Sequence, residues 1–354
     1  MKVLIIADPS RVDRLARPLE AVGIEVALSL APGRGKLGRL RWRRQVLRDA
    51  RAGHDVIISD MAGPIALEAA HAARRAGCPF VMRWRGDLWQ EWDDPLHSRR
   101  IFGLKSVWGK WVLNNIVAKS DLLVPVSHSL SRSIAAATGC DQVKIVTVPI
   151  PVDTETFAPG DAAEARKRMG LEREHIITLV MPFQYTDKVR GLELFLPALR
   201  AFVDAHDDTE ALIVGDGGLR EKFEREHAAL LDRPGITMYG FCAEMPLAYR
   251  ACDVYCHFSF FDACPNVMLE AWASGRPVLV NDFPPLVDLM DEGRAGRVLD
   301  SSAKVEDVAA ALEELLYDPD LRARLGEEGR RAVVEKFSYQ AVGRRLVSAF
   351  ETVL

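Results

Sequence analysis

The sequence has no apolar run near the roughly 20 residues that a membrane-spanning helix needs. Its six cysteines form no CxxC pair and no zinc-binding spacing, so we expect neither a disulfide framework nor a metal site. The first residues do not resemble a secretory signal, because the short run VLIIA is followed at once by charged residues. No repeat or low-complexity segment occurs either. We therefore expect buried thiols and a globular protein in the reducing cytoplasm.

The net charge of −4 is small, but it is divided unevenly along the chain. Residues 1–150 hold 23 of the 46 basic and 14 of the 50 acidic residues, a balance of +9, which leaves −13 for the rest. A length of 354 residues suggests about two domains. Halves of opposite charge indicate two modules that meet different partners.

Short apolar runs alternate with helix-period segments along both halves. Such runs predict strands of parallel sheets that are covered by helices on both faces. A turn-rich segment, PIPVDTETFAPGDAAEA (149–165), separates the two series and is the best linker. The stretch 305–354 is helical by period, with a break near Phe337–Ser338. The expected strands lie in KVLIIAD (2–8), EVALSL (25–30), DVIISD (55–60), PFVMRW (79–84), DLLVPVS (121–127), KIVTVPI (144–150), HIITLVMPF (175–183), TEALIVGDGG (209–218), GITMYGF (235–241), CDVYCHFS (252–259), RPVLVND (276–282) and GRVLD (296–300).

This organisation predicts two doubly wound, Rossmann-like α/β domains of similar size. In such sheets, ligands bind beyond the carboxyl ends of the strands. Two facing domains would place a ligand in the cleft between them.

The most informative stretch is FFDACPNVMLEAWASGRPVLV, residues 260–280. Pro265 suits the first turn of a helix that we expect to run to Ala273, because its fixed φ fits there and no amide proton is lost. Asp262 would precede this helix, and Glu270 would lie about two turns inside it. The alternative is a capped structural helix with a surface glutamate. In the functional interpretation, the start of this helix is an anion site for a diphosphate, formed by the backbone amides of Asn266, Val267 and Met268.

A second stretch, MPFQYTDKVRGLELF, carries two cations after an expected strand. Lys188 and Arg190 are expected in a loop before Gly191 and an apolar helix. Arg190 would bind phosphate oxygens with two hydrogen bonds and Lys188 as a point charge. A solvated charged loop is the alternative.

Two further turns follow expected strands in the same half. In LIVGDGGLREKF, Gly215, Gly217 and Gly218 form a tight turn where the backbone could approach a ligand, although the GxGxxG fingerprint is incomplete. Gly215 and Asp216 are the candidate binding residues of this turn. After Gly240, the loop at Phe241 and Cys242 would present backbone groups to a flat base. Plain strand-to-helix turns are the alternative for both.

Together these stretches resemble the retaining family-4 glycosyltransferases of the GT-B fold. The acidic pair in residues 260–280 is similar to the family's two acids eight residues apart, with Asp262 in place of the first glutamate. The glycine turn, the segment GITMYGFCAEMPLAYRACDVYCHFS and the crossover VSHSLSRSIAAATGCDQVKIVTVPIPVDTETFAP also resemble the family. The resemblance is strong from about Lys144 onward and weak in the first 120 residues.

The resemblance implies a division of labour between domains. Residues 1–150 would bind the acceptor and residues 151–336 the nucleotide sugar, while residues 337–354 would form a helix that returns to the first domain. Glu270 would hold the ribose hydroxyls of the donor, and Asp262 would face the donor sugar.

The remaining donor contacts follow from the same resemblance. The amides of residues 266–268 would hold the diphosphate, and Phe241 with Cys242 would flank the base. Arg190–Gly191 matches a Lys–Gly pair of the family. Met181–Pro182 stand where the family usually has Gly–Arg, so Lys188 is expected to replace a missing phosphate arginine. The loop before Gly191 is also longer, and DPSRVD replaces a glycine pair after the first strand.

In the N-terminal half, VMRWRGDLWQEW places Arg85 and Asp87 where the family often has a histidine. Asp87 would orient a sugar hydroxyl and Arg85 would hold an anionic group. A turn with an ion pair is the alternative. His128 is expected to start a helix rather than to act as a base.

Two segments of this half combine basic residues with tryptophan. Residues 34–51 hold eight basic residues and one acid, with Trp42 among them, and residues 99–111 hold four more basic residues with Trp108 and Trp111. Such a pattern occurs on solvated helix faces, at anionic membrane surfaces or lipid-linked acceptors, and at other anionic ligands. We do not expect nucleic acid as a partner.

We therefore predict a retaining hexosyltransferase that moves a sugar from a UDP- or GDP-sugar to an acceptor hydroxyl, without a cofactor or metal. Cations and helix-end amides would stabilise the departing nucleoside diphosphate. We leave open whether the basic N-terminal half also contacts the inner membrane surface. The alternatives are another GT-B enzyme, such as a sugar-nucleotide epimerase or phosphorylase, and a non-catalytic sugar-nucleotide binder. The expected catalytic residues are Asp262, Lys188, Arg190, Asp87 and Arg85.

Overall fold

The structure is a computed structural model, and the residues it describes are 1–31, 36–89, 104–184 and 186–354. The chain divides into two compact units, and each is described by itself. Unit 1 consists of Met1–Pro151 together with Ser338–Leu354, and unit 2 of Val152–Phe337.

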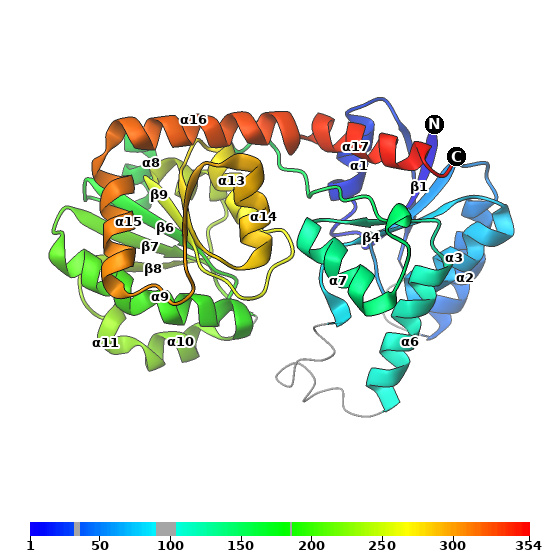
Figure 1. Cartoon of the computed structure of the whole chain (residues 1–354), viewed down its shortest axis with the longest axis horizontal. Coiled ribbons are helices and arrows are strands. Elements are labelled where there is room, and N and C mark those ends of the chain that lie inside the picture. Colours follow the sequence, from blue (N-terminus) through cyan, green and yellow to red (C-terminus); the bar gives the residue numbers. More distant parts are fainter. Residues whose placement is uncertain (32–35, 90–103, 185) are drawn as a thin grey trace. The chain divides into compact units, whose positions relative to one another are not determined.

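Unit 1 is a parallel sheet with helices on both faces (Figure 1). Its strands are β1 (Lys2–Ala7), β2 (Glu25–Leu30), β3 (Val56–Ser59), β4 (Phe80–Trp84) and β5 (Leu122–Pro125). Its helices are α1 (Asp13–Glu20), α2 (Lys36–Ala50), α3 (Pro64–Ala76), α6 (Leu104–Lys119), α7 (His128–Thr138), the 3₁₀ turn η1 (Gln142–Lys144) and α17 (Tyr339–Glu351). The strand order β2-β1-β3-β4-β5 reverses between β1 and β3. This reversal is the topological switch point, where doubly wound sheets bind ligands.

The expected strand at residues 144–150 is wrong. Only Ile145 forms a bridge to the sheet, at Leu123. The Val148 amide donates to the Pro125 carbonyl at 3.0 Å, so the chain lies along β5 for a short distance. Pro149 and Pro151 have no amide hydrogen, and the ladder cannot continue through them.

The C-terminal helix α17 packs against α1 within unit 1 (Figure 1). Ser338 caps it, accepting a hydrogen bond from the Ala341 amide at 3.3 Å, as expected from the break near this residue. A Cβ at Gly343 would lie 2.0 Å from the Pro18 carbonyl oxygen. The glycine therefore allows the close approach that seats α17 on α1.

Unit 2 is a second parallel sheet that is also covered on both faces. Its strands are β6 (His175–Val180), β7 (Thr209–Val214), β8 (Ile236–Gly240), β9 (Val254–His257), β10 (Val278–Asn281) and β11 (Gly296–Leu299). Its helices are α8 (Ala162–Met169), α9 (Thr186–Ala205), α10 (Arg220–Glu226), α11 (Ala228–Leu231), α12 (Met245–Ala251), α13 (Asn266–Ala273), α14 (Pro284–Gly293), α15 (Val305–Tyr317) and α16 (Pro319–Lys336). The order β11-β10-β9-β6-β7-β8 reverses between β6 and β9, which is the switch point of this unit.

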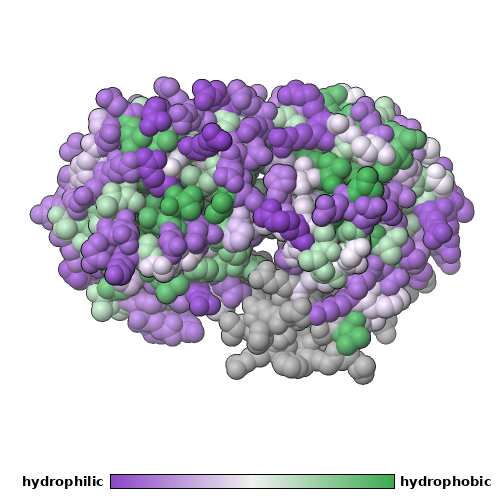
Figure 2. Space-filling model, viewed as in Figure 1, coloured by the Kyte–Doolittle hydropathy of each residue, from purple (hydrophilic) through white to green (hydrophobic). Residues whose placement is uncertain are grey.

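The cores of the two units follow the strand pattern of the sequence. The central strands β3 and β4 and the edge strand β5 are buried along their whole length, whereas the edge strands β2 and β11 are partly exposed. Figure 2 shows polar side chains over most of the visible surface, with hydrophobic ones in scattered patches. The predicted fold class, two doubly wound Rossmann-like units, is confirmed. In the described parts of the chain, no helix combines the length and apolarity that a membrane span requires.

Candidate functional site

At the switch point of unit 2, the segments that follow β6 and β9 meet. Helix α9 begins at Thr186, so Lys188 and Arg190 lie in its first two turns and not in a loop, as the sequence led us to expect. Asp187 in the first turn favours this earlier start, because a carboxylate stabilises a helix N-terminus. A Cβ at Gly191 would lie 2.0 Å from the Phe258 carbonyl oxygen. Glycine at this position therefore lets α9 approach the segment after β9.

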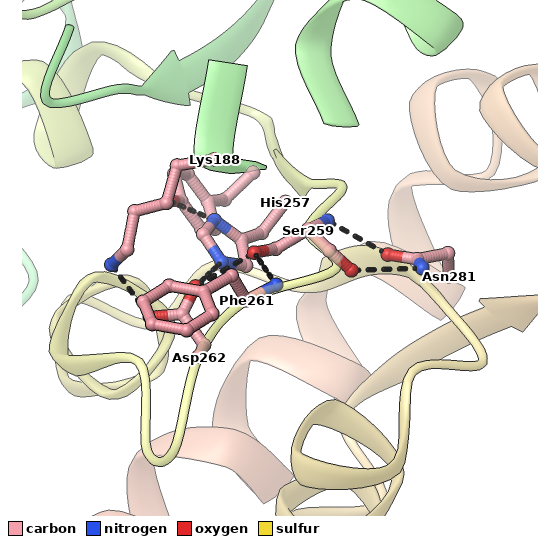
Figure 3. Close-up of polar contacts among 7 residues, drawn as sticks. Lys188, His257, Ser259, Phe261, Asp262 and Asn281 are labelled. Atoms are coloured by element: carbon pink, nitrogen blue, oxygen red, sulfur yellow. Dashed lines mark hydrogen bonds and ion pairs between the residues drawn. The ribbon is translucent and has the colours of Figure 1, made fainter. Parts of the chain in front are cut away.

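That close approach brings Lys188 to Asp262, as Figure 3 shows. Lys188 Nζ donates to Asp262 Oδ1 at 2.7 Å. On the other oxygen, Asp262 Oδ2 accepts from Ser259 Oγ at 2.9 Å and lies 3.1 Å from His257 Nε2. The Asp262 side chain is only 8% exposed. We call Lys188, His257, Ser259, Asp262 and Asn281 the Asp262 network.

Asn281, at the end of β10, fixes the loop that carries Asp262. Its Oδ1 accepts from the Ser259 amide at 2.9 Å, and its Nδ2 donates to the Ser259 carbonyl at 3.0 Å (Figure 3). The side chain thus pairs with the backbone as a neighbouring strand would. Ser259 Oγ also accepts from the Phe261 amide at 3.2 Å, which tightens the turn before Asp262.

The network keeps the Asp262 carboxyl ionised. Burial alone would raise its pKa, but the hydrogen bond and charge of His257 and the charge of Lys188 outweigh burial and lower the pKa to about 2. A carboxylate of this kind orients a cation and accepts a hydroxyl hydrogen across the physiological pH range. Sequence reasoning identified Asp262 and Lys188 separately but missed their pairing and the roles of His257, Ser259 and Asn281.

The Gly191→Ala variant is expected to lose activity because its Cβ meets the Phe258 carbonyl. Relieving that contact separates α9 from the loop and Lys188 from Asp262. We expect a loss of about 1–3 kcal/mol in the free energy of unfolding, measured by denaturant titration, together with a fall in the activity that the sequence predicts. Gly218→Ala is the matched control, since a Cβ there meets nothing within 4 Å. Equal behaviour of the two variants would contradict the packing role of Gly191.

Helix α13 presents Glu270 and the expected anion site. The helix runs from Asn266 to Ala273 with Pro265 as its N-cap, so its predicted end is confirmed. Glu270 lies about one turn inside and not two, because the helix begins only at Asn266. It is not a free surface residue: the hydroxyl of Tyr249, a fully buried residue of α12, donates to Glu270 Oε2 at 2.8 Å.

The amides at the start of α13 differ in availability. The Met268 amide donates to the Pro265 carbonyl at 3.2 Å. Among the described residues, the amides of Asn266 and Val267 have no partner, as is usual in a first helical turn. Two of the three predicted amides are therefore open to an anion.

The glycine turn after β7 is explained by packing against the chain itself. A Cβ at Gly215 would lie 1.9 Å from the Met181 carbonyl oxygen, and φ at this residue is +141°. Gly217 meets the Phe183 carbonyl in the same way. The Asp216 side chain accepts from the Gly217 amide at 2.7 Å. These contacts account for the turn without a ligand.

Phe241 and Cys242 after β8 have different environments. Phe241 is 77% exposed and is free to stack on a flat group. Cys242 is buried in a hydrophobic cluster with α8 and α12 residues, and burial raises the pKa of its thiol. Arg190, at the other predicted site, is exposed and lies 5.7 Å above the Phe260 ring centroid.

In unit 1, the two predicted N-terminal residues have partners of their own. Arg85 Nη1 lies 3.4 Å from Asp60 Oδ2, a carboxylate that sequence reasoning missed. Asp87 accepts a hydrogen bond from Ser133 of α7. His128 begins α7, as predicted, and its side chain is exposed.

The two basic, tryptophan-containing segments are described only in part. Arg34 and residues 99–103 lie outside the described residues. Trp42 of α2 is buried, whereas Trp108 and Trp111 of α6 are about half exposed. Arg43 forms an ion pair with Glu68 of α3 at 2.9 Å.

Within the described chain, one group of side chains has the spacing of a metal site. It consists of Glu174, His175 and Asp208, whose ligand atoms lie within 4.8 Å of one another. The group sits at the amino ends of β6 and β7, the edge of the sheet opposite to the Asp262 network.

Comparison with known proteins covers both units. The family model "Glycosyltransferase Family 4" matches residues 2–156, and the model "Glycosyl transferases group 1" matches residues 165–332. Spore coat protein SA of Bacillus subtilis is 25% identical over 245 residues, which is 65% of this chain and 64% of that protein. A D-inositol 3-phosphate glycosyltransferase of Kribbella flavida is 27% identical over 254 residues, 67% of this chain and 58% of that protein. The alignments thus span about three fifths of these curated relatives.

Solved structures share the fold over the whole chain. HepE of Anabaena, crystallised with UDP, has a TM-score of 0.78 at 17% identity and covers 99% of this chain and 100% of its own. Sucrose-phosphate synthase of Thermosynechococcus elongatus has a TM-score of 0.73 at 15% identity, and the match covers 100% of this chain and 99% of that protein's chain. With both units matched by family models and both seen in these folds, the chain belongs to the family-4 glycosyltransferases of the GT-B fold.

Proposed function

We propose that this chain is a retaining hexosyltransferase that uses a nucleoside diphosphate sugar and no metal. The observation that carries the proposal is the convergence at one switch point of a partly buried Lys188–Asp262 pair and the N-terminus of α13 with Glu270. In this proposal Glu270 holds the ribose hydroxyls, and Asp262 faces the transferred sugar. Unit 1 takes the acceptor, whose hydroxyl attacks the sugar.

The reaction mainly requires that negative charge on the leaving group be stabilised. As the glycosidic bond to phosphate breaks, negative charge gathers on the departing diphosphate. In the proposal, Lys188, Arg190 and the open amides of Asn266 and Val267 stabilise that charge. The protein's own cations then supply what a metal ion supplies in other transferases. Phe241 stacks on the base from its exposed position.

We propose the base of the donor nucleotide from solved structures of the same fold whose ligands are known. HepE of Anabaena was crystallised with UDP, with UDP and glucose, and with UDP-glucose. The fold of this chain is the same, so we propose a UDP-hexose as the donor ahead of a GDP-hexose. An anionic or lipid-linked acceptor agrees with the +9 balance of residues 1–150.

A thermal-shift panel of UDP- and GDP-hexoses tests the proposal. A ligand at 100 times its Kd stabilises the folded state by about 2.7 kcal/mol, so we expect a rise in Tm with a UDP-hexose that survives excess EDTA. Slow release of UDP from the same donor would show turnover. No shift with any nucleotide sugar, or a shift that EDTA abolishes, would contradict the proposed donor site or its independence of metal.

Product analysis separates the alternatives. An epimerase would convert the donor without releasing UDP, and a phosphorylase would need inorganic phosphate. A non-catalytic binder would show the Tm shift and no UDP release. The proposed transferase releases UDP, and NMR of its glycoside product would show the anomeric configuration of the donor.

A further inference from the structure

His257 lies deeper in the Asp262 network than Lys188 does (Figure 3). It is the last residue of β9, and its side chain is 5% exposed, against 23% for Lys188. Its two ring nitrogens have different neighbours: Nε2 lies 3.1 Å from Asp262 Oδ2, and Nδ1 lies 3.4 Å from the hydroxyl oxygen of Tyr255. The imidazole therefore connects a carboxylate of the site to a hydroxyl group in the core.

Tyr255 is placed to fix the orientation of hydrogen on this imidazole. It precedes His257 by two residues on β9, so both side chains lie on the same face of the sheet. Tyr255 is fully buried, and burial, together with the charges of Glu270 and Asp262, raises the pKa of its hydroxyl. The hydroxyl therefore keeps its proton. Within the described residues, its hydrogen-bond partner is His257 Nδ1.

The position of the imidazole hydrogen follows from this pairing. A buried hydroxyl that cannot donate is costly, so Tyr255 donates to Nδ1 of His257. A neutral imidazole has one N–H and one acceptor nitrogen. The hydrogen then lies on Nε2 and points to Asp262 Oδ2. Histidine gains a second proton in acid solution, and it is there that the charge of His257 acts on the Asp262 carboxyl.

The two oxygens of Asp262 have unequal numbers of partners. Oδ2 accepts from Ser259 Oγ and from His257 Nε2, whereas Oδ1 accepts from Lys188 Nζ alone among the described residues. A carboxylate oxygen has two acceptor positions. Oδ2 is therefore fully occupied, and Oδ1 keeps one position for a hydroxyl group.

Building on the proposed function, we infer that His257 is a positioning residue for sugar transfer. Its Nε2–H, fixed by the Tyr255 hydroxyl on Nδ1, turns Asp262 so that the open position of Oδ1 faces a hydroxyl of the donor sugar. His257 acts through Asp262 and does not itself contact the sugar.

Nitrogen-15 NMR of the full chain, labelled at histidine, tests the position of the hydrogen without any substrate. Protonated and unprotonated ring nitrogens resonate far apart, and the signals of His257 are those that His257→Gln removes. At neutral pH we expect a hydrogen on Nε2 and none on Nδ1, and Tyr255→Phe should shift the Nδ1 signal. A hydrogen on Nδ1, or on both nitrogens, would contradict the inference.

Two substitutions at His257 separate positioning from packing. The amide nitrogen of glutamine reaches the place of Nε2 and can donate to Asp262, whereas asparagine reaches only the place of Nδ1. We expect His257→Asn to transfer sugar at least about tenfold more slowly, the size of one hydrogen bond to a charged group, with UDP affinity unchanged. His257→Gln should recover most of that loss. Equal rates in the two variants would overturn the inference.

His206 provides the matched control pair. Its Nδ1 lies 2.9 Å from the Phe202 carbonyl oxygen and its Nε2 lies 3.6 Å from Glu313 Oε1, so it too stands between a carboxylate and a second polar group. It lies between α9 and β7, at the amino edge of the sheet and away from the Asp262 network. His206→Asn and His206→Gln should both transfer sugar at the wild-type rate per folded molecule. A loss confined to His206→Asn would show a general effect of the substitution and not a role of His257.

The two neighbouring tyrosines should affect different steps. The ring centroids of Tyr249 and Tyr255 are 5.7 Å apart and both side chains are fully buried, but Tyr249 donates to Glu270. Tyr255→Phe should lower turnover and keep UDP affinity, whereas Tyr249→Phe should weaken UDP binding. Loss of UDP affinity in Tyr255→Phe with turnover intact would contradict the role of His257.

UDP-glucose turnover by the wild type separates this inference from the proposed function. If the wild type neither binds UDP-glucose nor releases UDP, the proposed function fails, and the NMR result still decides where the hydrogen of His257 lies. If the wild type releases UDP and His257→Asn does so at the same rate, only the role of His257 fails.

Discussion

Asp262→Asn is expected to fold, to bind the donor about as well as the wild type and to transfer sugar at least about 10²-fold more slowly. Asparagine has the size of aspartate but cannot neutralise Lys188, whose Nζ lies 2.7 Å from Oδ1. The ammonium then loses the carboxylate that orients it, and the transferred sugar loses a charged acceptor. Steady-state kinetics with UDP release as the readout, together with calorimetry of UDP binding, separate turnover from affinity.

Asp253→Asn is the control for this variant. Asp253 is likewise a buried aspartate of unit 2, 2.6 Å from Arg166 and 2.8 Å from the Ile176 amide, but it lies at the amino end of β9, at the opposite edge of the sheet from Asp262. Its replacement should lower stability and leave turnover per folded molecule intact. Wild-type turnover in Asp262→Asn, or an equal loss in Asp253→Asn, would show that the Asp262 network has no special part in transfer.

Glu270→Gln should weaken UDP binding by about 10²-fold, since hydrogen bonds to a charged group contribute about 1.5–3 kcal/mol each. The buried Tyr249 hydroxyl donates to Glu270 at 2.8 Å and holds the carboxylate in place. Burial raises the pKa of Tyr249, so the hydroxyl stays a donor. Tyr249→Phe should therefore weaken UDP binding to a smaller extent. Calorimetric titration with UDP measures both variants.

Glu314→Gln controls for the loss of a carboxylate as such. Glu314 is likewise hydrogen-bonded, here by Arg297, but it lies on α15 and outside the proposed donor site. Its UDP affinity should equal that of the wild type. If Glu270→Gln binds UDP as the wild type does, Glu270 does not hold the ribose.

Much of the fold could be predicted because local signals agree with the global arrangement. Unbroken apolar runs such as VIIS and LLVP are fully buried strands of a parallel sheet, the first in its centre and the second at its edge. Ser338 as a helix cap marked the break before the last helix. The prediction failed at residues 144–150, where an apolar run looks like a strand but Pro149, which has no amide hydrogen, cannot donate to a ladder.

The site was less predictable, since its contacts come from elements that are neighbours only in the folded sheet. Lys188 and Asp262 are 74 residues apart and meet because β6 and β9 adjoin. Asn281 reaches Ser259 from β10. No local spacing reveals such pairs.

Other residues were predicted to contact a ligand, but the structure explains them by packing within the chain. Gly215 suggested room for a ligand, whereas the structure fills that room with the Met181 carbonyl. Cys242 was paired with Phe241 by position, but it is a core side chain.

A crystal structure of the full chain with UDP tests the central proposal most directly. We predict ribose hydroxyls within hydrogen-bond distance of Glu270 and the diphosphate at the Asn266 and Val267 amides, with Lys188 or Arg190 beside it. The distal phosphate should point toward Asp262, where the sugar would begin. UDP bound elsewhere, with Glu270 paired only with Tyr249 and no phosphate at the start of α13, would contradict the proposed donor site.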